Sequence, residues 1–277
     1  MGVALPSLTL TLVSLPSVPD MANDSTPAVA GGANDRTALV TGGGSGIGRA
    51  VAVALAERGM DVVVAGRRAD ALTATAHLHA GIRTHVGDVS EPGDVAEMVR
   101  AATAASGRVD VLVNNAGMGL PAPLGRIEPD AARRIWEVNV LGSTLLTQAA
   151  LPFLIDSGGV VVNVSSTFGT RPAPRISQYG AAKAAVEHLT RSWALELAGH
   201  GVRVNAVAPG PTESEALHAM GLSSAEIERL KADEQQAIPL GRRGRPEDVA
   251  AWIVALADPA IWVTGQVIAV DGGFGLA

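Results

Sequence analysis

The only tyrosine of the chain, Tyr179, is followed four residues later by Lys183, one of its two lysines. Residues four apart lie one turn apart on the same face of an α-helix. A tyrosine hydroxyl titrates near about 10, and a neighbouring ammonium group lowers that pKa because it favours the phenolate. The pair therefore predicts a general acid–base group at Tyr179. A solvated helix face is the alternative, but the scarcity of both residue types favours chemistry.

Two serines, Ser165 and Ser166, follow the apolar run Val160–Val164, and Ser166 precedes Tyr179 by thirteen residues. A serine hydroxyl at the end of a strand can donate a hydrogen bond to a substrate oxygen and hold it beside an acid–base group. These serines strengthen the functional interpretation of Tyr179 and Lys183.

A glycine-rich loop follows the first apolar run and precedes an Ala-rich segment, for which we expect a helix over Ala50–Arg58. Glycines let the backbone approach a phosphate closely, and a helix N-terminus offers free N–H groups. The alternative is a tight turn without a ligand, but the position after a strand and before a helix favours a dinucleotide phosphate site. The residues expected to contact the cofactor are Gly42, Gly44, Ser45, Gly46, Ile47 and Gly48.

After the second apolar run, Gly66 occupies the place where an acidic residue would bind the adenosine ribose, and Arg67 and Arg68 follow. A carboxylate there would repel a 2′-phosphate, whereas an arginine attracts it. The segment therefore favours NADP(H). Ordinary solvated surface charges are the alternative for both arginines.

The ends of the third and fourth runs also carry candidate cofactor contacts. Asp88, followed by Val89, could accept a hydrogen bond from the adenine amino group, or could instead cap a helix that begins near Glu91. Asn115, Ala116 and Gly117 follow the fourth run, and such short residues suit a backbone packed against a ligand.

Short β-branched runs alternate with Ala-rich segments of helical length from Arg36 onward. The runs are continuously apolar, as expected for strands covered on both faces. This alternation predicts one α/β domain over 34–277, a Rossmann-type, doubly wound parallel sheet of about seven strands with helices on both faces. Ligands of such sheets bind beyond the carboxyl ends of the strands. The expected strands are Ala38–Val40, Val62–Val64, Ile82–Val86, Val109–Val113, Val160–Val164, Val202–Val207 and Val267–Val270.

Residues 1–33 differ in composition from the rest. Their apolar part is interrupted by prolines, and no lysine or arginine precedes Arg36, whereas a secretory signal has a positive first region. We expect a flexible N-terminal extension, with a start at Met21 or a cleaved signal as alternatives.

The composition excludes several classes of function. The 277 residues are 47% hydrophobic and 17% charged, which is enough for a large core. A net charge of −6 argues against nucleic-acid or anionic-membrane partners. The chain contains no cysteine, which excludes disulfides and thiol chemistry and is compatible with a cytoplasmic location. The six histidines show no metal-ligand spacing, so we expect no metal site.

Taken in order, these motifs resemble the short-chain dehydrogenase/reductase family, in the branch of about 250 residues that includes 3-oxoacyl-ACP reductases. The resemblance covers about Arg36 to Gly273. It rests on TGGGSGIG, Asp88, NNAG, Asn139, Ser166, Tyr179-x-x-x-Lys183, Pro209-Gly210, GRRGRPEDVA from Gly241, and VTGQ from Val263 with the later Asp271-Gly272-Gly273.

The resemblance implies a role for each matching residue. Tyr179 would exchange the proton with the substrate oxygen, Lys183 would bind the nicotinamide ribose and lower the pKa of Tyr179, and Ser166 would bind the substrate oxygen. Asn139 would hold a water of a proton relay to Lys183. Pro209, Gly210 and Thr212 would shape the nicotinamide pocket. The wall of the substrate pocket would include the stretch 211–237.

The sequence as a whole predicts an oxidoreductase that prefers NADP(H), acts on a small-molecule carbonyl or alcohol, and, by resemblance, forms a homotetramer. One departure weakens the NADP(H) prediction: Ser45 occupies a loop position where many NADP-dependent members have Arg or Lys. An NAD(H)-dependent alcohol dehydrogenase of the same family and a non-catalytic dinucleotide-binding protein are the alternatives.

Overall fold

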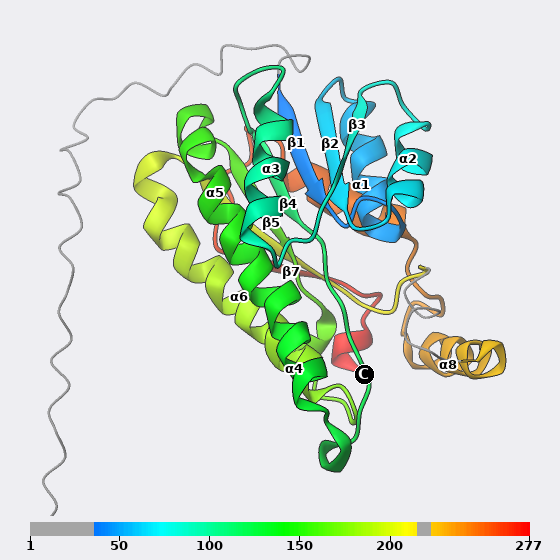
Figure 1. Cartoon of the computed structure of the whole chain (residues 1–277). Helices are drawn as coiled ribbons and strands as arrows, with labels where there is room; N and C mark the ends of the chain where they lie inside the picture. The colour runs from blue at the N-terminus through cyan, green and yellow to red at the C-terminus, as the bar shows by residue number, and fades with distance from the viewer. Residues whose placement is uncertain (1–35, 215–222) are drawn as a thin grey trace, which may run out of the picture.

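The computed structural model describes residues 36–214 and 223–277. The predicted N-terminal extension, 1–33, lies outside the described residues. The described chain forms the predicted architecture, a seven-stranded sheet in the order β3-β2-β1-β4-β5-β6-β7, with every neighbouring pair parallel. The prediction of a doubly wound parallel sheet is therefore confirmed (Figure 1).

The β-branched runs form the strands because both faces of the five inner strands are covered and nearly all of their side chains are buried, whereas the two edge strands are more exposed. The predicted strands match the observed ones within a few residues; the fourth begins at Val111, not Val109. The strands are β1 (Thr37–Thr41), β2 (Asp61–Gly66), β3 (Ile82–Val86), β4 (Val111–Asn114), β5 (Val160–Val164), β6 (Arg203–Pro209) and β7 (Val267–Val270).

Two helical layers enclose the sheet. One core cluster joins β-strand residues such as Val40 and Val162 to α1 and α9, and the other joins Leu39 and Val161 to α3, α5 and α6. The helices are α1 (Gly46–Ala56), α2 (Ala69–Ala76), α3 (Pro92–Thr103), α4 (Pro129–Trp136), α5 (Gly142–Ser157), α6 (Ser177–Leu197), α8 (Ser224–Ala237) and α9 (Pro246–Leu256). Figure 1 shows α8 beyond the end of the sheet, apart from both layers.

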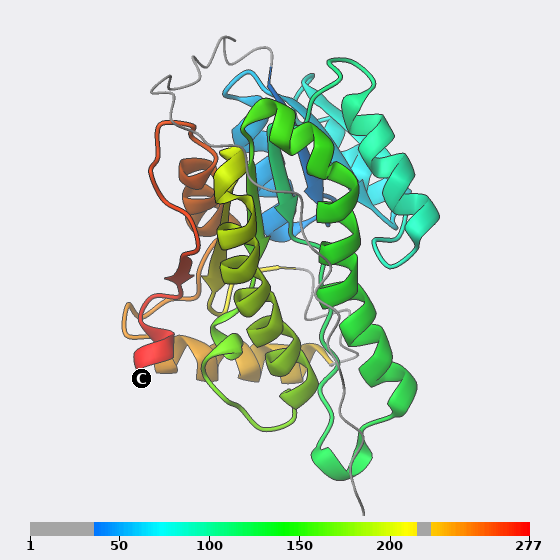
Figure 2. The same ribbon diagram turned by 90° about the vertical axis from the view of Figure 1, so that its left-hand side faces the viewer.

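Helices α4 and α5 continue into each other through a π-helical turn, Glu137–Leu141, and form one long column in Figure 2. The segment Pro129–Ser157 is long and apolar enough, by length and composition alone, to cross a membrane. However, Leu146, Ala150 and Leu154 are fully buried in the core, as in a core helix of a globular protein.

Helix α1 begins at Gly46, four residues before the expected start at Ala50. Gly46 has a φ of 50°, a left-handed value that glycine adopts without a steric penalty, so the chain enters the helix within the glycine-rich loop. Three of the predicted cofactor contacts, Gly46, Ile47 and Gly48, therefore form the first turn of α1.

Candidate active site

Tyr179 and Ser166 meet at the carboxyl end of β5. Tyr179 is partly buried in the first turn of α6. Ser166, which is 6% exposed, is the second residue after the strand and caps a short turn that begins at Thr167. The two hydroxyls are hydrogen-bonded to each other. Gly119 leaves room for the ring, since a Cβ there would lie 3.2 Å from Tyr179 Cδ2. The predicted proximity of Ser166 and Tyr179 is thus observed.

The pKa of Tyr179 is raised above its ordinary value of 10 because burial disfavours the phenolate, although the hydrogen bond with Ser166 partly offsets this effect. This direction is opposite to the expected lowering by Lys183. The physical reason is burial, which outweighs the effect of Lys183, whose Nζ lies 5.8 Å from the centroid of the Tyr179 ring. The Tyr179 hydroxyl is therefore protonated at neutral pH.

Lys183 is 4% exposed, and burial lowers its pKa to about 8. Its Nζ donates a hydrogen bond to the carbonyl oxygen of Val164, 2.8 Å away, at the end of β5. Since the amine keeps its proton below about pH 8, it supplies a buried positive charge beside Tyr179 at neutral pH.

Asn139 lies in the π-helical turn between α4 and α5, a feature that often marks functional sites. Its Nδ2 donates to the carbonyl oxygens of Met118 and Ile135, both at 2.8 Å. These bonds fix the amide so that the buried Oδ1, which has no hydrogen-bond partner among the described residues, borders Gly117. A Cβ on Gly117 would lie 2.8 Å from Asn139 Oδ1 and 3.3 Å from Lys183 Nζ. The two polar atoms thus face the same point.

Residues at the end of β4 fix the start of the glycine-rich loop by hydrogen bonds. Asn115 Nδ2 donates to the carbonyl oxygen of Thr41 at 2.8 Å, and the Thr41 hydroxyl accepts from the backbone N–H groups of Asn115 and Ala116, each at 3.1 Å. Thr41 was not among the predicted site residues. Helix α1 starts at the end of this loop with no side-chain cap, so its first N–H groups remain available to a ligand. The arrangement suits a pyrophosphate.

Gly48 is the position where the loop tolerates a side chain least. A Cβ there would collide with the carbonyl oxygen of Gly42 and with Asn115 Nδ2. We expect Gly48→Ala to lower the free energy of unfolding by about 2 kcal/mol, as overpacking does, and to weaken NADPH binding. Urea unfolding and nicotinamide fluorescence measure these effects. Gly93→Ala, in α3 where nothing lies within 4 Å, is the matched control and should not destabilise. Equal behaviour of the two variants would contradict the proposed fit of the loop.

The end of β2 carries positive charge and no carboxylate. Arg67 is exposed and makes no hydrogen bond or ion pair within the described residues. Arg68 Nη2 donates to the Ser45 hydroxyl at 3.2 Å, which links the two predicted contacts. Arg49, which the sequence did not single out, donates through Nη2 to the carbonyl oxygen of Gly44 at 2.5 Å. Arg49 and Arg68 thus both contact the glycine-rich loop, and Arg67 lies at the adjoining end of β2.

Asp88 is engaged within the protein. One carboxylate oxygen accepts from the backbone N–H of Ser90 at 3.0 Å and from its hydroxyl at 2.7 Å, and the other pairs with Arg134 of α4. Burial alone would raise the pKa of Asp88, but these hydrogen bonds lower it overall. The helix-cap alternative is wrong: α3 begins at Pro92, and its cap residue is Glu91. Val89 is buried in the core, with both its side chain and its carbonyl oxygen packed against Gly142.

The predicted contacts beyond β6 lie at the same edge of the sheet. Pro209 ends the strand, and Gly210 N–H donates to the carbonyl oxygen of Val270. A Cβ on Gly210 would lie 2.6 Å from Asp271 Cβ, so only glycine fits there. The Thr212 hydroxyl donates to the carbonyl oxygen of Gly210 at 2.9 Å and holds the turn.

A buried carboxylate beneath the site escaped the sequence analysis. Glu187, one turn after Lys183, accepts a 2.9 Å hydrogen bond from the Ser165 hydroxyl. Burial raises the pKa of Glu187, partly offset by Ser165 and by Arg191. No sequence pattern distinguishes Glu187 from Glu196, the exposed acidic residue of α6. Within 36–214 and 223–277, no group of three or more His, Cys, Asp or Glu side chains could hold a metal ion.

Comparison with known proteins agrees with this geometry. A family model described as enoyl-(acyl carrier protein) reductase matches residues 42–275. The cis-4-hydroxycyclohexanecarboxylate dehydrogenase of Sinomonas cyclohexanicum is 42% identical over 239 residues, covering 83% of this chain and 92% of that protein. The 3-oxoacyl-(acyl-carrier-protein) reductase of Thermotoga maritima is 38% identical over 235 residues, covering 83% and 93%.

Solved structures give the same result. The 3-ketoacyl-(acyl-carrier-protein) reductase of Brucella melitensis, crystallised with NADH, matches with a TM-score of 0.81 and 33% identity over 88% of this chain and 99% of that one. A short-chain dehydrogenase/reductase from Caenorhabditis elegans, crystallised with its cofactor, matches with a TM-score of 0.83 and 32% identity over 88% and 96%. Because family model, relatives and sheet topology agree over most of its length, the chain belongs to the short-chain dehydrogenase/reductase family of oxidoreductases.

Proposed function

We propose that the protein is an NADP(H)-preferring oxidoreductase that interconverts a carbonyl and an alcohol, with Tyr179 as the acid–base group. The observation that carries the proposal is the meeting of Tyr179, Ser166, Lys183 and Asn139 at the carboxyl edge of the sheet, beside an uncapped helix N-terminus. Ligands of doubly wound sheets bind at this edge.

The chain's own residues would manage the proton and the substrate oxygen. The Tyr179 hydroxyl, protonated at neutral pH, gives its proton to the carbonyl oxygen during reduction and takes it back during oxidation. Ser166 donates a hydrogen bond to the same oxygen as negative charge develops on it. The charged amine of Lys183 stabilises the phenolate left on Tyr179.

The residues present fit a nicotinamide dinucleotide. The loop Gly42–Gly48 and the first turn of α1 would hold the pyrophosphate, the residues Asn115–Gly117 and Pro209–Thr212 would border the nicotinamide half, and the group would supply or accept a hydride when bound. Asn139 Oδ1, which has no hydrogen-bond partner among the described residues, and Lys183 Nζ, which bonds to Val164, face one point near Gly117. A water at that point would bridge the two atoms and carry a proton back to Tyr179.

Cofactor preference follows from charge at the end of β2. Gly66 offers no carboxylate to a ribose, and Arg67 is free among the described residues to pair with a 2′-phosphate. Preference for NAD(H) is the alternative, and the Brucella relative was crystallised with NADH. Asp88 would meet the adenine only through a carboxylate already bound to Ser90 and Arg134.

Replacing Arg67 tests the preference. We expect Arg67→Ala to weaken NADPH binding about tenfold, or about 1.4 kcal/mol, and to leave NADH binding unchanged, as followed by nicotinamide fluorescence. Arg58→Ala is the control, because Arg58 is an exposed arginine just after α1 whose side chain, within the described part of the chain, bonds only to the carbonyl oxygen of Ala54. Equal losses for both cofactors would refute the contact with the 2′-phosphate, and failure of the wild type to bind either cofactor would refute the proposed function.

A carboxylate at position 66 should give the reverse result. A Cβ on Gly66 meets only Leu72 Cδ2, at 3.7 Å, so the side chain of Gly66→Asp fits. The new carboxylate would repel a 2′-phosphate and bind ribose hydroxyls, and should turn the ratio of the two affinities toward NADH.

The relatives suggest where to look for substrates. One is named for a hydroxycyclohexane carboxylate and two for 3-oxoacyl thioesters, all of which are secondary alcohols or ketones near a second polar group. We therefore propose such compounds as substrates and suggest an acetoacetyl thioester, 4-oxocyclohexanecarboxylate and cyclohexanone as the first panel.

We also propose a homo-oligomer, a tetramer by resemblance, in the cytoplasm. Large apolar side chains that remain exposed support the assembly: Leu141 and Trp136 on the column of α4 and α5 are 46% and 39% exposed, and Trp262 before β7 is fully exposed. Such side chains on a monomer surface commonly mark an interface.

A further inference from the structure

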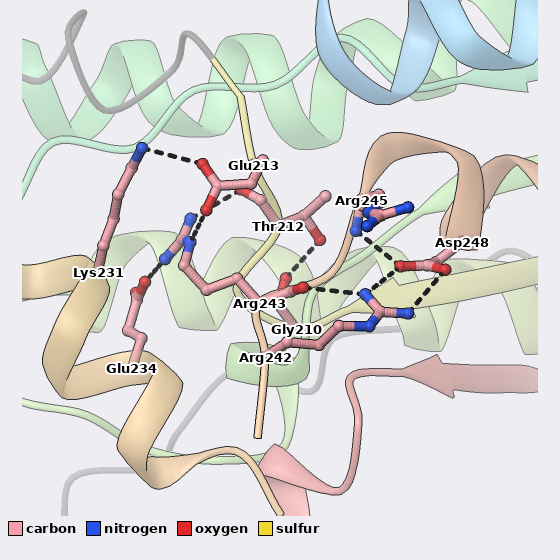
Figure 3. A network of polar contacts seen from close by, with 9 residues as sticks. All are labelled: Gly210, Thr212, Glu213, Lys231, Glu234, Arg242, Arg243, Arg245 and Asp248. Carbon is pink, nitrogen blue, oxygen red and sulfur yellow. Dashed lines mark hydrogen bonds and ion pairs between the residues drawn. The ribbon is translucent and has the colours of Figure 1, made fainter. Parts of the chain in front are cut away.

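Three segments that are distant in the sequence meet at the side chain of Arg243 (Figure 3). Its Nε donates to Glu213 Oε1 at 2.7 Å, and its Nη2 donates to the carbonyl oxygen of Thr212 at 2.8 Å, just beyond β6. Glu234 of helix α8 completes an ion pair with the same guanidinium. Lys231, one turn earlier on α8, pairs with Glu213 at 3.0 Å. We name Glu213, Lys231, Glu234 and Arg243 the Arg243 cluster.

The burial of Arg243 distinguishes this cluster from a surface ion pair. Its side chain is 6% exposed, although arginine is rarely buried. Removing a guanidinium from water is costly unless charged partners satisfy it, and here two carboxylates and a carbonyl oxygen do so. The planar fork of arginine reaches three acceptors in different directions, which the single point charge of lysine does not.

The backbone below Arg243 is fixed to the turn that follows β6. Thr212 and Gly244 form a parallel bridge, with Glu213 N–H donating to the carbonyl oxygen of Gly244 and Gly244 N–H donating to that of Pro211, each at 2.9 Å. Thr212 in turn bonds to Gly210, where the proposed nicotinamide pocket begins. A continuous set of polar contacts thus runs from the end of β6 through Arg243 to α8.

Within the described part of the chain, few other side chains join helix α8 to the rest of the fold. Of its side chains, Ile227 is buried, and the helix stands beyond the end of the sheet in Figures 1 and 2. Its position therefore depends on Lys231 and Glu234. Glu234 is joined to the turn through Arg243, and Lys231 is joined to it through Glu213, which Arg243 also holds.

We propose that Arg243 is a positioning residue that couples cofactor binding at the Gly210–Glu213 turn to the placement of helix α8 beside the substrate site. The inference rests on the proposed function for the identity of the cofactor. Because coupling is reciprocal, a cofactor that fixes the turn also fixes α8, and a change that loosens α8 lowers the affinity for the cofactor.

Hydrogen–deuterium exchange of α8, with and without NADPH, tests the coupling. In the wild type, NADPH should slow exchange in Ser224–Ala237. In Arg243→Met, NADPH should still bind, about tenfold more weakly, and should no longer slow exchange in α8. Glu234→Ala removes only the ion pair between Arg243 and α8, and in this variant NADPH should slow exchange less than it does in the wild type. It keeps the test valid if Arg243→Met fails to fold.

Arg242→Met is the matched control. Arg242 is the adjacent arginine and is partly exposed. It pairs with Asp248 at 2.6 Å and donates to the backbone carbonyl oxygen of Arg243 at 3.0 Å, but none of its contacts in Figure 3 reaches Thr212, the Arg243 side chain or α8. This variant should keep both NADPH affinity and the slowed exchange. Two results would refute the coupling while the proposed function stands. In one, NADPH binds the wild type without slowing exchange in α8; in the other, NADPH slows this exchange in Arg243→Met and Glu234→Ala as much as in the wild type. If the wild type binds neither NADPH nor NADH, the proposed function fails first and the coupling with it.

Discussion

Tyr179→Phe should lower the turnover of any reducible ketone in the panel about 10³-fold, the usual contribution of a positioned acid–base group, while leaving the affinity for NADPH within a factor of about two. The substitution removes the hydroxyl that shares a hydrogen bond with Ser166 and keeps the ring that packs against Gly119. The binding site for the cofactor is unchanged. Oxidation of NADPH measures turnover, and nicotinamide fluorescence measures affinity.

A companion variant separates loss of the proton from loss of structure. Ser166→Ala should lower turnover less than Tyr179→Phe, because it removes a hydrogen bond to the substrate oxygen but leaves the acid. If Tyr179→Phe retained full turnover, Tyr179 would not be the acid–base group, and the protein would need another proton donor at this edge of the sheet.

The single tyrosine also permits a direct titration. The chain has one tyrosine, so the ultraviolet absorbance of its phenolate reports Tyr179 alone. Burial should place the midpoint of the free protein above the ordinary value of 10. The family resemblance implies that the midpoint falls when NADP⁺ adds positive charge beside the ring. A midpoint that NADP⁺ leaves unchanged would contradict that role for the cofactor and Lys183.

How much of this the sequence could predict depends on how local each feature is. The strands were predictable because β-branched runs buried on both faces are continuously apolar, and the Tyr179–Lys183 spacing places both residues on α6 by helical geometry alone. The predicted start of α1 was four residues too late. Glycines lower helix propensity, and the chain enters the helix through the left-handed φ of Gly46, which the sequence does not reveal.

Features that need distant partners were not predictable. Asp88 was predicted as an adenine contact or a helix cap, and neither possibility included Arg134, which comes 46 residues later. The predicted direction of the shift in the Tyr179 pKa was wrong. Burial, which depends on the whole fold, raises this pKa and outweighs a lysine whose Nζ lies 5.8 Å from the ring centroid. Arg243 was noticed only as part of a motif, and its partners lie on two other segments.

Lys183→Met should stabilise the protein at neutral pH although it removes the charge proposed to support Tyr179. Burial lowers the pKa of Lys183 from 10.5 to about 8, so folding the charged amine costs about 3 kcal/mol at pH 7. The bond from Nζ to Val164, which methionine cannot replace, returns about 1 kcal/mol. We therefore expect a gain of about 2 kcal/mol in the free energy of unfolding from urea denaturation, together with a large loss of turnover.

The dependence on pH identifies the charge as the cause. Between the two pKa values the unfolded chain holds more protons on Lys183 than the folded chain, so the stability of the wild type rises with pH relative to the variant. From pH 7 to about pH 9.5 the advantage of Lys183→Met should shrink by about 2 kcal/mol. The window ends below pH 10 because Tyr179, whose folded pKa is raised above that value, then contributes with the opposite sign.

Lys183→Gln distinguishes charge from packing. Its amide can still donate to Val164, but it carries no proton that titrates in this range, so its stability relative to the wild type should follow the same pH trend as that of Lys183→Met. A difference between wild type and both variants that stays constant from pH 7 to about pH 9.5 would show that the amine is not under electrostatic strain. A difference that shrinks would show that the fold carries a buried charge at a cost in stability, as expected of a residue retained for chemistry.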